Sequence, residues 1–205
     1  SPALFENLSK GLTEMGCDVV SIGVSATPIL YHITVEEKFP LGIMITASHN
    51  PKDYNGMKLC TNESQLVYYD KGLDEIEELV EKDDFAPAEV AGTITEKDVS
   101  QEYIEYIKGF QNKLRKKYNI VVDTGNGSAG PFVKGILDDY ENLSYTPLYF
   151  ELDGTYPNHE ANPLKMDNLK DLSEQIKSEG ADFGFAYDGD ADRCILLDEN
   201  GDVVN

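Results

Sequence analysis

Short apolar stretches typical of buried strands alternate with segments of helical periodicity along almost the whole chain. In the second half, strands are predicted at 119–123, 144–150, 182–187 and 194–198, and helices at 131–140 and 168–179. Such alternation favours α/β layers, in which helices cover a central sheet. The first half shows the same alternation, so we expect α/β domains in both halves.

The first half of the chain is predicted to begin with a helix that has Ser1 as its N-cap and Pro2 as its first residue and that runs to Met15, before Gly16. Strands at 18–23 and 41–46 and helices from residue 27 and at 74–81 should follow. Leu73, Ile76, Leu79 and Val80 fall on one side of the last helix, which we expect to face inward. We place the domain boundary so that domain 1 covers 1–112 and domain 2 covers 113–205.

The charge balance excludes several classes of partner. The 205 residues include 38 acids and 17 bases, a formal net charge of −21. Nucleic acid and anionic membrane surfaces attract basic patches, so we expect neither as a partner. No apolar run is long enough to span a bilayer. Cys17, Cys60 and Cys194 form no CxxC pair, which indicates a soluble, cytoplasmic protein without a disulfide framework or zinc site.

A first candidate site follows the apolar strand at 41–46, in the sequence Thr-Ala-Ser-His-Asn-Pro at 46–51. Ser48 should emerge at the carboxyl end of the strand, where α/β proteins place their ligands. A surface turn rich in Ser, His and Asn is the alternative interpretation. A Ser48–His49 nucleophile pair is not expected, because adjacent side chains on an extended backbone point to opposite sides.

A second candidate site is the sequence Asp-Gly-Asp-Ala-Asp-Arg at 188–193. The carboxylates of Asp188, Asp190 and Asp192 alternate with small residues, so they can converge on one hard cation such as Mg²⁺ or Ca²⁺. A solvated acidic turn is the alternative. An EF-hand is rejected, because Arg193 stands where that loop requires glycine and because the preceding segment has strand character.

A third candidate is the glycine loop at 125–130, a GxGxxG match between a predicted strand and a predicted helix. Glu151 at the end of the next strand completes much of the dinucleotide fingerprint. A dinucleotide-binding oxidoreductase domain is therefore the alternative function from another class. Any tight strand-to-helix turn also favours glycine.

The first two motifs together resemble the α-D-phosphohexomutase superfamily, and its phosphomannomutase/phosphoglucomutase branch in particular. Further stretches that resemble this family are 27–28, 54–58, 122–127 and 153–159. The resemblance covers nearly the whole chain. It implies two three-layer α/β domains with mixed sheets, and a glycine loop that opens the second domain and binds no dinucleotide.

The resemblance also implies roles for individual residues. Ser48 would be the phosphoserine that exchanges a phosphoryl group with the 1- and 6-positions of a hexose phosphate. Its phosphoryl oxygen would bind Mg²⁺ together with Asp188, Asp190 and Asp192. Lys58 would be the general acid/base for the sugar hydroxyl. Arg193 would hold phosphate oxygens, and His49 would be a local hydrogen-bond or acid/base partner.

The chain departs from this family in extent. Full-length members have four domains, and the amino-terminal strands, the sugar-recognition loop and the distal phosphate-binding loop have no counterpart here. We therefore expect a fragment that binds Mg²⁺ and has little or no turnover. A non-catalytic phosphosugar-binding or metal-binding module is a second alternative. The identity of the hexose phosphate, the phosphorylation of Ser48 and the oligomeric state are left open.

Overall fold

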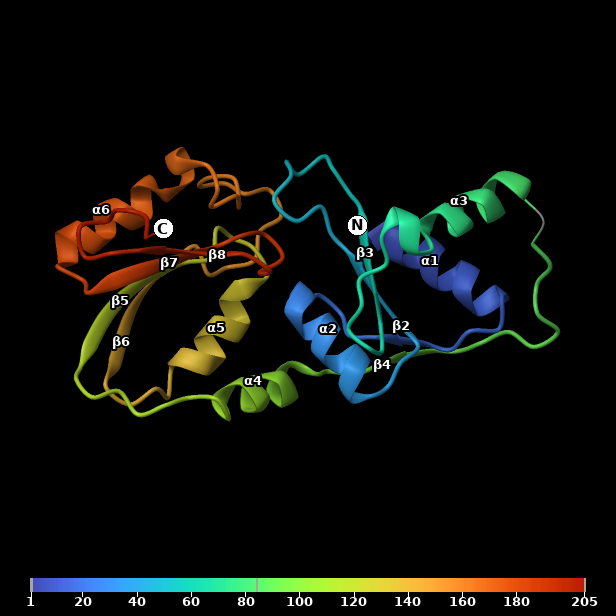
Figure 1. Cartoon of the computed structure of the whole chain (residues 1–205), viewed down its shortest axis with the longest axis horizontal. Helices are drawn as coiled ribbons and strands as arrows, with labels where there is room; N and C mark the ends of the chain where they lie inside the picture. Colours follow the sequence, from blue (N-terminus) through green and yellow to red (C-terminus); the bar gives the residue numbers. More distant parts are fainter. Residues whose placement is uncertain (1, 84, 205) are drawn as a thin grey trace. The chain divides into compact units, whose positions relative to one another are not determined.

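The computed structural model describes residues 2–83 and 85–204, and the chain divides into two compact units (Figure 1). The first unit comprises Ser1–Val24, Ile29–Thr46 and Asn55–Val99. The second comprises Ser25–Pro28, Ala47–Tyr54 and Ser100–Asn205. Two short segments of the amino-terminal half thus belong to the second unit.

The first unit contains two small sheets with helices around them. Its elements, in chain order, are α1 (Pro2–Glu14), β1 (Val19–Ser21), most of α2 (Thr27–Glu36), β2 (Leu41–Ile45), β3 (Met57–Thr61), η1 (Tyr69–Lys71), α3 (Leu73–Lys82) and β4 (Ile94–Glu96). Strands β1 and β4 are parallel, whereas β2 and β3 are antiparallel. Figure 1 shows α2 on one side of the β2–β3 pair and α1 and α3 on the other.

Helix α2 packs closely on the β2–β3 pair. A Cβ atom at Gly42 would lie 2.2 Å from Thr34 Oγ1 and 3.0 Å from Cys60 Sγ, so only glycine permits this approach. Ile29 and Ile33 of α2 are buried. Burial of an aliphatic side chain of this size contributes about 1.5–3 kcal/mol. This packing fixes the carboxyl end of β2, from which the loop with Ser48 leaves.

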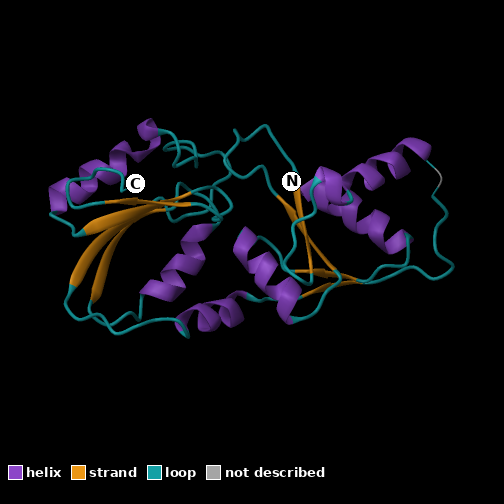
Figure 2. Ribbon diagram, in the orientation of Figure 1, coloured by secondary structure: helices purple, strands orange, loops and turns teal. Residues whose placement is uncertain are grey.

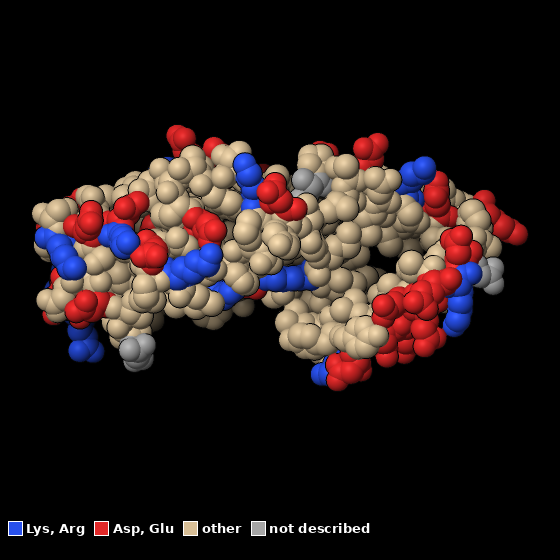
Figure 3. Space-filling model, turned by 90° about the horizontal axis from the view of Figure 1, so that it is seen from above, with Lys and Arg blue, Asp and Glu red and all other residues tan. Residues whose placement is uncertain are grey.

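The prediction that α3 turns an apolar face inward is wrong. The side chains of Ile76, Leu79 and Val80 are 44%, 53% and 62% exposed, and α3 buries no residue. Periodicity shows that a helix has an apolar side but does not specify a neighbour that covers it. Figure 3 shows acidic side chains gathered over α3, whose sequence LDEIEELVEK is rich in Asp and Glu.

The second unit is built on one four-stranded mixed sheet with the order β6-β5-β7-β8. Its elements are α4 (Ser100–Lys108), β5 (Tyr118–Asp123), α5 (Ala129–Leu137), β6 (Leu143–Leu148), η2 (Met166–Leu169), α6 (Lys170–Glu179), β7 (Phe183–Tyr187) and β8 (Cys194–Leu197). Strands β6, β5 and β7 are parallel, and β8 pairs antiparallel with β7. Helix α6 covers one face, and α4 and α5 lie on the other (Figures 1 and 2).

The core of the second unit lies between α6 and the sheet. Leu172 and Ile176 of α6 are fully buried against Val121 of β5, Ala186 of β7 and Leu197 of β8. These contacts fix the carboxyl ends of β5 and β7. The glycine loop at 125–130 and the acidic loop at 188–193 follow these two ends, so the core holds both loops in place.

The expected fold class, α/β with mixed sheets, is confirmed. Most predicted elements lie within a few residues of the observed ones, but β3 and β4 were missed. Helix α4 precedes the predicted boundary after residue 112, although its contacts place it in the second unit. The domain boundary itself stays a prediction. No helix within the described residues is long and apolar enough to cross a membrane.

Candidate active site

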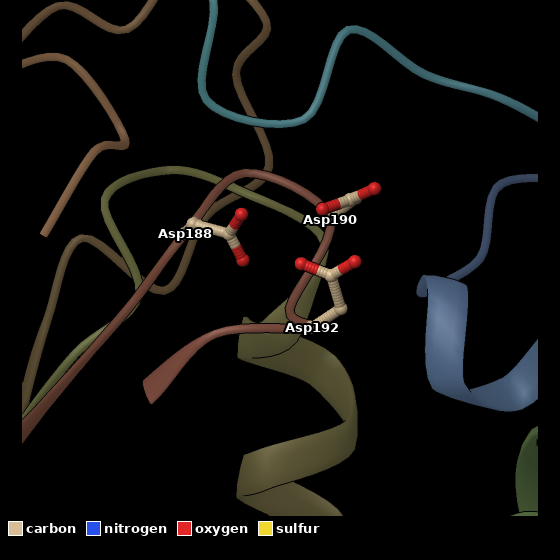
Figure 4. Close-up of side chains that lie close together, drawn as sticks. All are labelled: Asp188, Asp190 and Asp192. Atoms are coloured by element: carbon tan, nitrogen blue, oxygen red, sulfur yellow. The ribbon is translucent and has the colours of Figure 1, made fainter. Parts of the chain in front are cut away.

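The acidic loop 188–193 connects β7 to β8. The antiparallel register pairs Tyr187 with Cys194, so the chain reverses within this loop. One carboxylate oxygen each from Asp188, Asp190 and Asp192 lies within 4.8 Å of the other two. Figure 4 shows the three side chains projecting from this one loop. Asp188 and Asp190 are buried and Asp192 is more exposed, so the cluster opens to solvent on the Asp192 side.

Burial and like charges make this cluster electrostatically unfavourable by itself. Burial raises the pKa of Asp188, and the negative charge of Asp190 raises it further. Two hydrogen bonds oppose this shift: the backbone N–H of Arg193 donates to Asp188 Oδ1 at 3.1 Å, and the Ser48 hydroxyl donates to Asp188 Oδ2. The guanidinium of Arg193 also contacts this carboxylate, since its Nε donates to Asp188 Oδ2 at 3.0 Å. A positive charge at the cluster therefore stabilises the ionised form of Asp188.

Ser48 lies directly beside this cluster. It follows β2 and adopts a left-handed backbone conformation with φ of 55°, which is uncommon for a residue other than glycine. Its hydroxyl donates a hydrogen bond to Asp188 Oδ2 at 2.9 Å, although 140 residues separate the two. Backbone strain of this kind is concentrated at functional sites.

Arg193 joins Ser48 and His49 to the acidic loop. Its Nη2 donates to Ser48 Oγ at 2.5 Å and also donates to His49 Nδ1. His49 Nδ1 lies 3.4 Å from Ser48 Oγ. The expectation that Ser48 and His49 diverge assumed an extended backbone and is wrong, because the left-handed turn at Ser48 brings the two side chains together.

Thr27 contacts the acidic loop from a distant segment of the sequence. Its hydroxyl donates to Asp190 Oδ2 at 2.7 Å, and its backbone N–H donates to the carbonyl oxygen of Asp190 at 2.9 Å. Thr27 is fully buried. Sequence reasoning assigned no role to Thr27, although Thr27-Pro28 is one of the stretches that resemble the family.

The glycine loop packs against the acidic loop. The backbone N–H of Ser128 donates to the carbonyl oxygen of Gly189 at 2.9 Å. A Cβ atom at Gly127 would lie 2.8 Å from that oxygen, and one at Gly130 would lie 2.1 Å from the Phe150 carbonyl oxygen. Close backbone approach within the protein thus accounts for these glycines without a dinucleotide.

Lys58 lies on β3 and pairs with Met44 of β2 in the first unit. The other candidate residues, Ser48, His49, Arg193 and the three aspartates, all belong to the second unit. The structure therefore brings these six residues together in the second unit, whereas Lys58 belongs to the first unit.

The donor set fits a hard divalent cation. Three carboxylates offer oxygen ligands at a spacing that one ion can bridge, and the Ser48 hydroxyl adjoins them. Mg²⁺ prefers oxygen ligands and is usually bound through a few carboxylates together with phosphate oxygens. Within the described residues, Asp188, Asp190 and Asp192 form the one group of three or more acidic, His or Cys side chains that lie close enough together to hold a metal ion.

Comparisons with known proteins agree on one family for both parts of the chain. The family model described as phosphoglucomutase/phosphomannomutase, alpha/beta/alpha domain I, matches residues 1–87. The model for alpha/beta/alpha domain II of the same family matches residues 101–201.

Individual relatives give the same result. A phosphoglucomutase of Neisseria meningitidis is 40% identical over 203 residues, which are 99% of this chain and 43% of the relative. A phosphomannomutase of Vibrio cholerae is 38% identical over 209 residues, 100% of this chain and 45% of the relative. A crystal structure from Burkholderia thailandensis, described as a phosphoglucomutase/phosphomannomutase family protein, has a TM-score of 0.87 at 32% identity. The match covers 99% of this chain and 45% of the Burkholderia chain. The chain thus spans less than half the length of these relatives.

Proposed function

This chain belongs to the phosphoglucomutase/phosphomannomutase family, and on that premise we propose that it forms the phosphoryl-donor and metal half of a phosphohexomutase active site. The whole enzyme would interconvert hexose 1-phosphate and hexose 6-phosphate. The observation that carries the proposal is the 2.9 Å hydrogen bond from Ser48 to Asp188, which links the loop between β2 and β3, residues 46–56 (the serine loop), to the acidic loop.

In this proposal Ser48 is the phosphorylated residue. A phosphoserine carries a charge of roughly −1.5 to −2 at neutral pH. Beside three carboxylates such a charge requires cations, and the chain offers Arg193, whose Nη2 already donates to Ser48 Oγ. The planar guanidinium suits phosphate oxygens, since it presents several N–H donors in a fixed arrangement.

Asp188, Asp190 and Asp192 would hold Mg²⁺ together with a phosphoryl oxygen on Ser48. When bound, Mg²⁺ withdraws negative charge from the phosphoryl group, which is a main requirement of phosphoryl transfer. The spacing of the three carboxylates supports this assignment.

The transfer cycle exchanges one phosphoryl group in each direction. In the first step the bond between phosphorus and Ser48 Oγ breaks and a bond to a sugar hydroxyl oxygen forms. The hydroxyl proton passes to the general base, for which we propose Lys58, and Ser48 Oγ takes up a proton from solvent. The resulting hexose bisphosphate then returns its other phosphoryl group to Ser48. His49 accepts a hydrogen bond from Arg193 and would hold that guanidinium beside the phosphoserine.

The two halves of the proposal have separate consequences for the chain by itself. The proposed Mg²⁺ ligands all belong to the second unit, so the chain by itself should bind Mg²⁺. Turnover requires a cleft that retains the bisphosphate while it reorients. We propose that the parts of the relatives beyond this chain complete that cleft, so the chain alone should show little mutase activity.

The test combines intact mass with metal titration. The chain should carry one phosphoryl group after incubation with a hexose bisphosphate, and Ser48→Ala should not. Mg²⁺ titrated calorimetrically should bind the chain and not Asp190→Ala, whereas NAD(H) should give no signal. The proposal fails if phosphoryl transfer persists in Ser48→Ala or if Mg²⁺ binding persists in Asp190→Ala.

A further inference from the structure

Thr27 is a buried polar side chain in direct contact with a proposed metal ligand. Its hydroxyl donates to Asp190 Oδ2 at 2.7 Å across 163 positions of sequence. The exposed fraction of Thr27 is 0% and that of Asp190 is 4%, so water does not compete for this bond. A hydrogen bond to a charged acceptor in such surroundings is stronger than one between neutral groups.

Contact with a carboxylate distinguishes Thr27 from Ser128 and Ala161, which also support the acidic loop. Ser128 donates to the carbonyl oxygen of Gly189, and the carbonyl oxygen of Ala161 accepts a hydrogen bond from the Gly189 N–H. Both of these contacts hold the loop backbone. Thr27 holds the backbone as well, through its own N–H and the Asp190 carbonyl oxygen, but it also binds the carboxylate.

The local sequence keeps the Thr27 hydroxyl in place. Ser25, Ala26 and Thr27 form a buried segment that leads into α2. Pro28 restricts the backbone at the start of the helix because its ring fixes φ. Threonine is β-branched, so its χ1 angle has few accessible values. The hydroxyl therefore has little freedom to leave Asp190.

We propose that Thr27 is a positioning residue that orients the Asp190 carboxylate for Mg²⁺. The proposal rests on the proposed function, since it takes Asp190 as a metal ligand. Partners that hydrogen-bond a metal ligand fix its orientation, and their loss typically lowers metal affinity by about 10- to 100-fold. Thr27 reaches the ligand from the same chain segment that starts α2, so this segment and the acidic loop form the metal site together.

The test is a calorimetric Mg²⁺ titration of the chain with matched substitutions. Thr27→Val has nearly the same shape but lacks the hydroxyl, and it should bind Mg²⁺ about 10-fold or more weakly. Thr27→Ser retains the hydroxyl and should stay within a few-fold of the unsubstituted chain. Thr34→Val is the matched control, because it removes a buried threonine hydroxyl of the first unit that donates to the Leu30 carbonyl oxygen at 2.7 Å, and it should leave the affinity unchanged.

Two outcomes would overturn the proposal while the proposed function stands. Thr27→Val could bind Mg²⁺ as tightly as the unsubstituted chain, or Thr27→Ser could bind as weakly as Thr27→Val, which would assign the effect to packing. If the unsubstituted chain bound no Mg²⁺, the proposed function would fail first. A double-mutant cycle of urea unfolding with Thr27→Val and Asp190→Ala, which removes the acceptor oxygen, would then still measure the hydrogen bond, and the absence of coupling would refute the contact itself.

Discussion

His159 Nε2 lies 2.9 Å from Asp123 Oδ2 beside Gly125 of the glycine loop, and both side chains are largely buried. Burial by itself lowers the pKa of His159, but the hydrogen bond and the charge of Asp123 outweigh it and raise the pKa above the ordinary value of 6.5. Asp123 also accepts a hydrogen bond from the Gly125 N–H at 2.8 Å. The pair therefore connects the end of β5 to the glycine loop.

This pair predicts a pH-dependent contribution to stability. Because the folded-state pKa of His159 is raised, folding favours the protonated imidazole. The contribution is fully present below the unfolded-state pKa near 6.5 and is lost as the pH rises through the higher folded-state value. Urea unfolding of the unsubstituted chain and of His159→Gln should be measured at pH 6 and at pH 8. The two proteins should differ more in their free energy of unfolding at pH 6 than at pH 8. A difference that is equal at both pH values would contradict the prediction.

Asp190→Asn should have opposite effects on stability with and without metal. The amide oxygen can still accept the Thr27 hydrogen bond, but the charge that raises the pKa of Asp188 is removed. Without Mg²⁺ the free energy of unfolding should therefore rise, because less negative charge lies beside the buried Asp188. The unsubstituted chain should instead be stabilised by added Mg²⁺, by about 2.7 kcal/mol at 100 times the Kd.

Thermal unfolding of the unsubstituted chain and of Asp190→Asn, with and without Mg²⁺, measures the predicted changes in stability. Asp139→Asn serves as the control, because this exposed carboxylate is remote in sequence from the acidic loop and pairs with Lys108. If Mg²⁺ raised the melting temperature of Asp190→Asn as much as that of the unsubstituted chain, Asp190 would not be a ligand.

The contacts within the site differ in how far the sequence predicts them. Ser48 and Asp188 each follow an apolar strand, and strand ends have a recognisable local pattern, so their neighbourhoods were predictable. The bond from Thr27 to Asp190 joins segments 163 positions apart and has no local signal. The glycine loop was ambiguous for a related reason, since its motif fits both a dinucleotide and a close approach of Gly189.

The same distinction applies to the fold. Helices with regular apolar spacing, such as α1 and α6, were predicted because periodicity is a local property. Strand β4 was missed because Ile94–Glu96 is short and exposed, and its strand character depends on pairing with Val19–Ser21. Whether the apolar side of α3 is covered depends likewise on what lies beside it.

Gly189 should not tolerate a side chain. A Cβ atom there would lie 2.5 Å from the Ser48 carbonyl oxygen and 3.0 Å from the Tyr156 hydroxyl oxygen. Gly189→Ala must therefore displace the serine loop from the acidic loop, at a cost of about 1–3 kcal/mol in the free energy of unfolding. Gly154→Ala is the control, since nothing lies within 4 Å of its Cβ position. Urea unfolding of the two variants should separate them, and equal stability would refute the close approach.

Lys58 should affect turnover in the whole enzyme and leave metal binding intact. A positioned general acid/base contributes about 10²- to 10⁴-fold to the rate, so Lys58→Met should lower kcat by a factor in this range. Its Mg²⁺ affinity should match that of the unsubstituted enzyme, because the proposed ligands belong to the loops at 48 and 188–192. Lys52→Met is the matched control, an exposed lysine in the serine loop. Steady-state mutase assays of the full-length enzyme carrying either Lys58→Met or Lys52→Met measure the two kcat values. Equal values would exclude Lys58 as the acid/base.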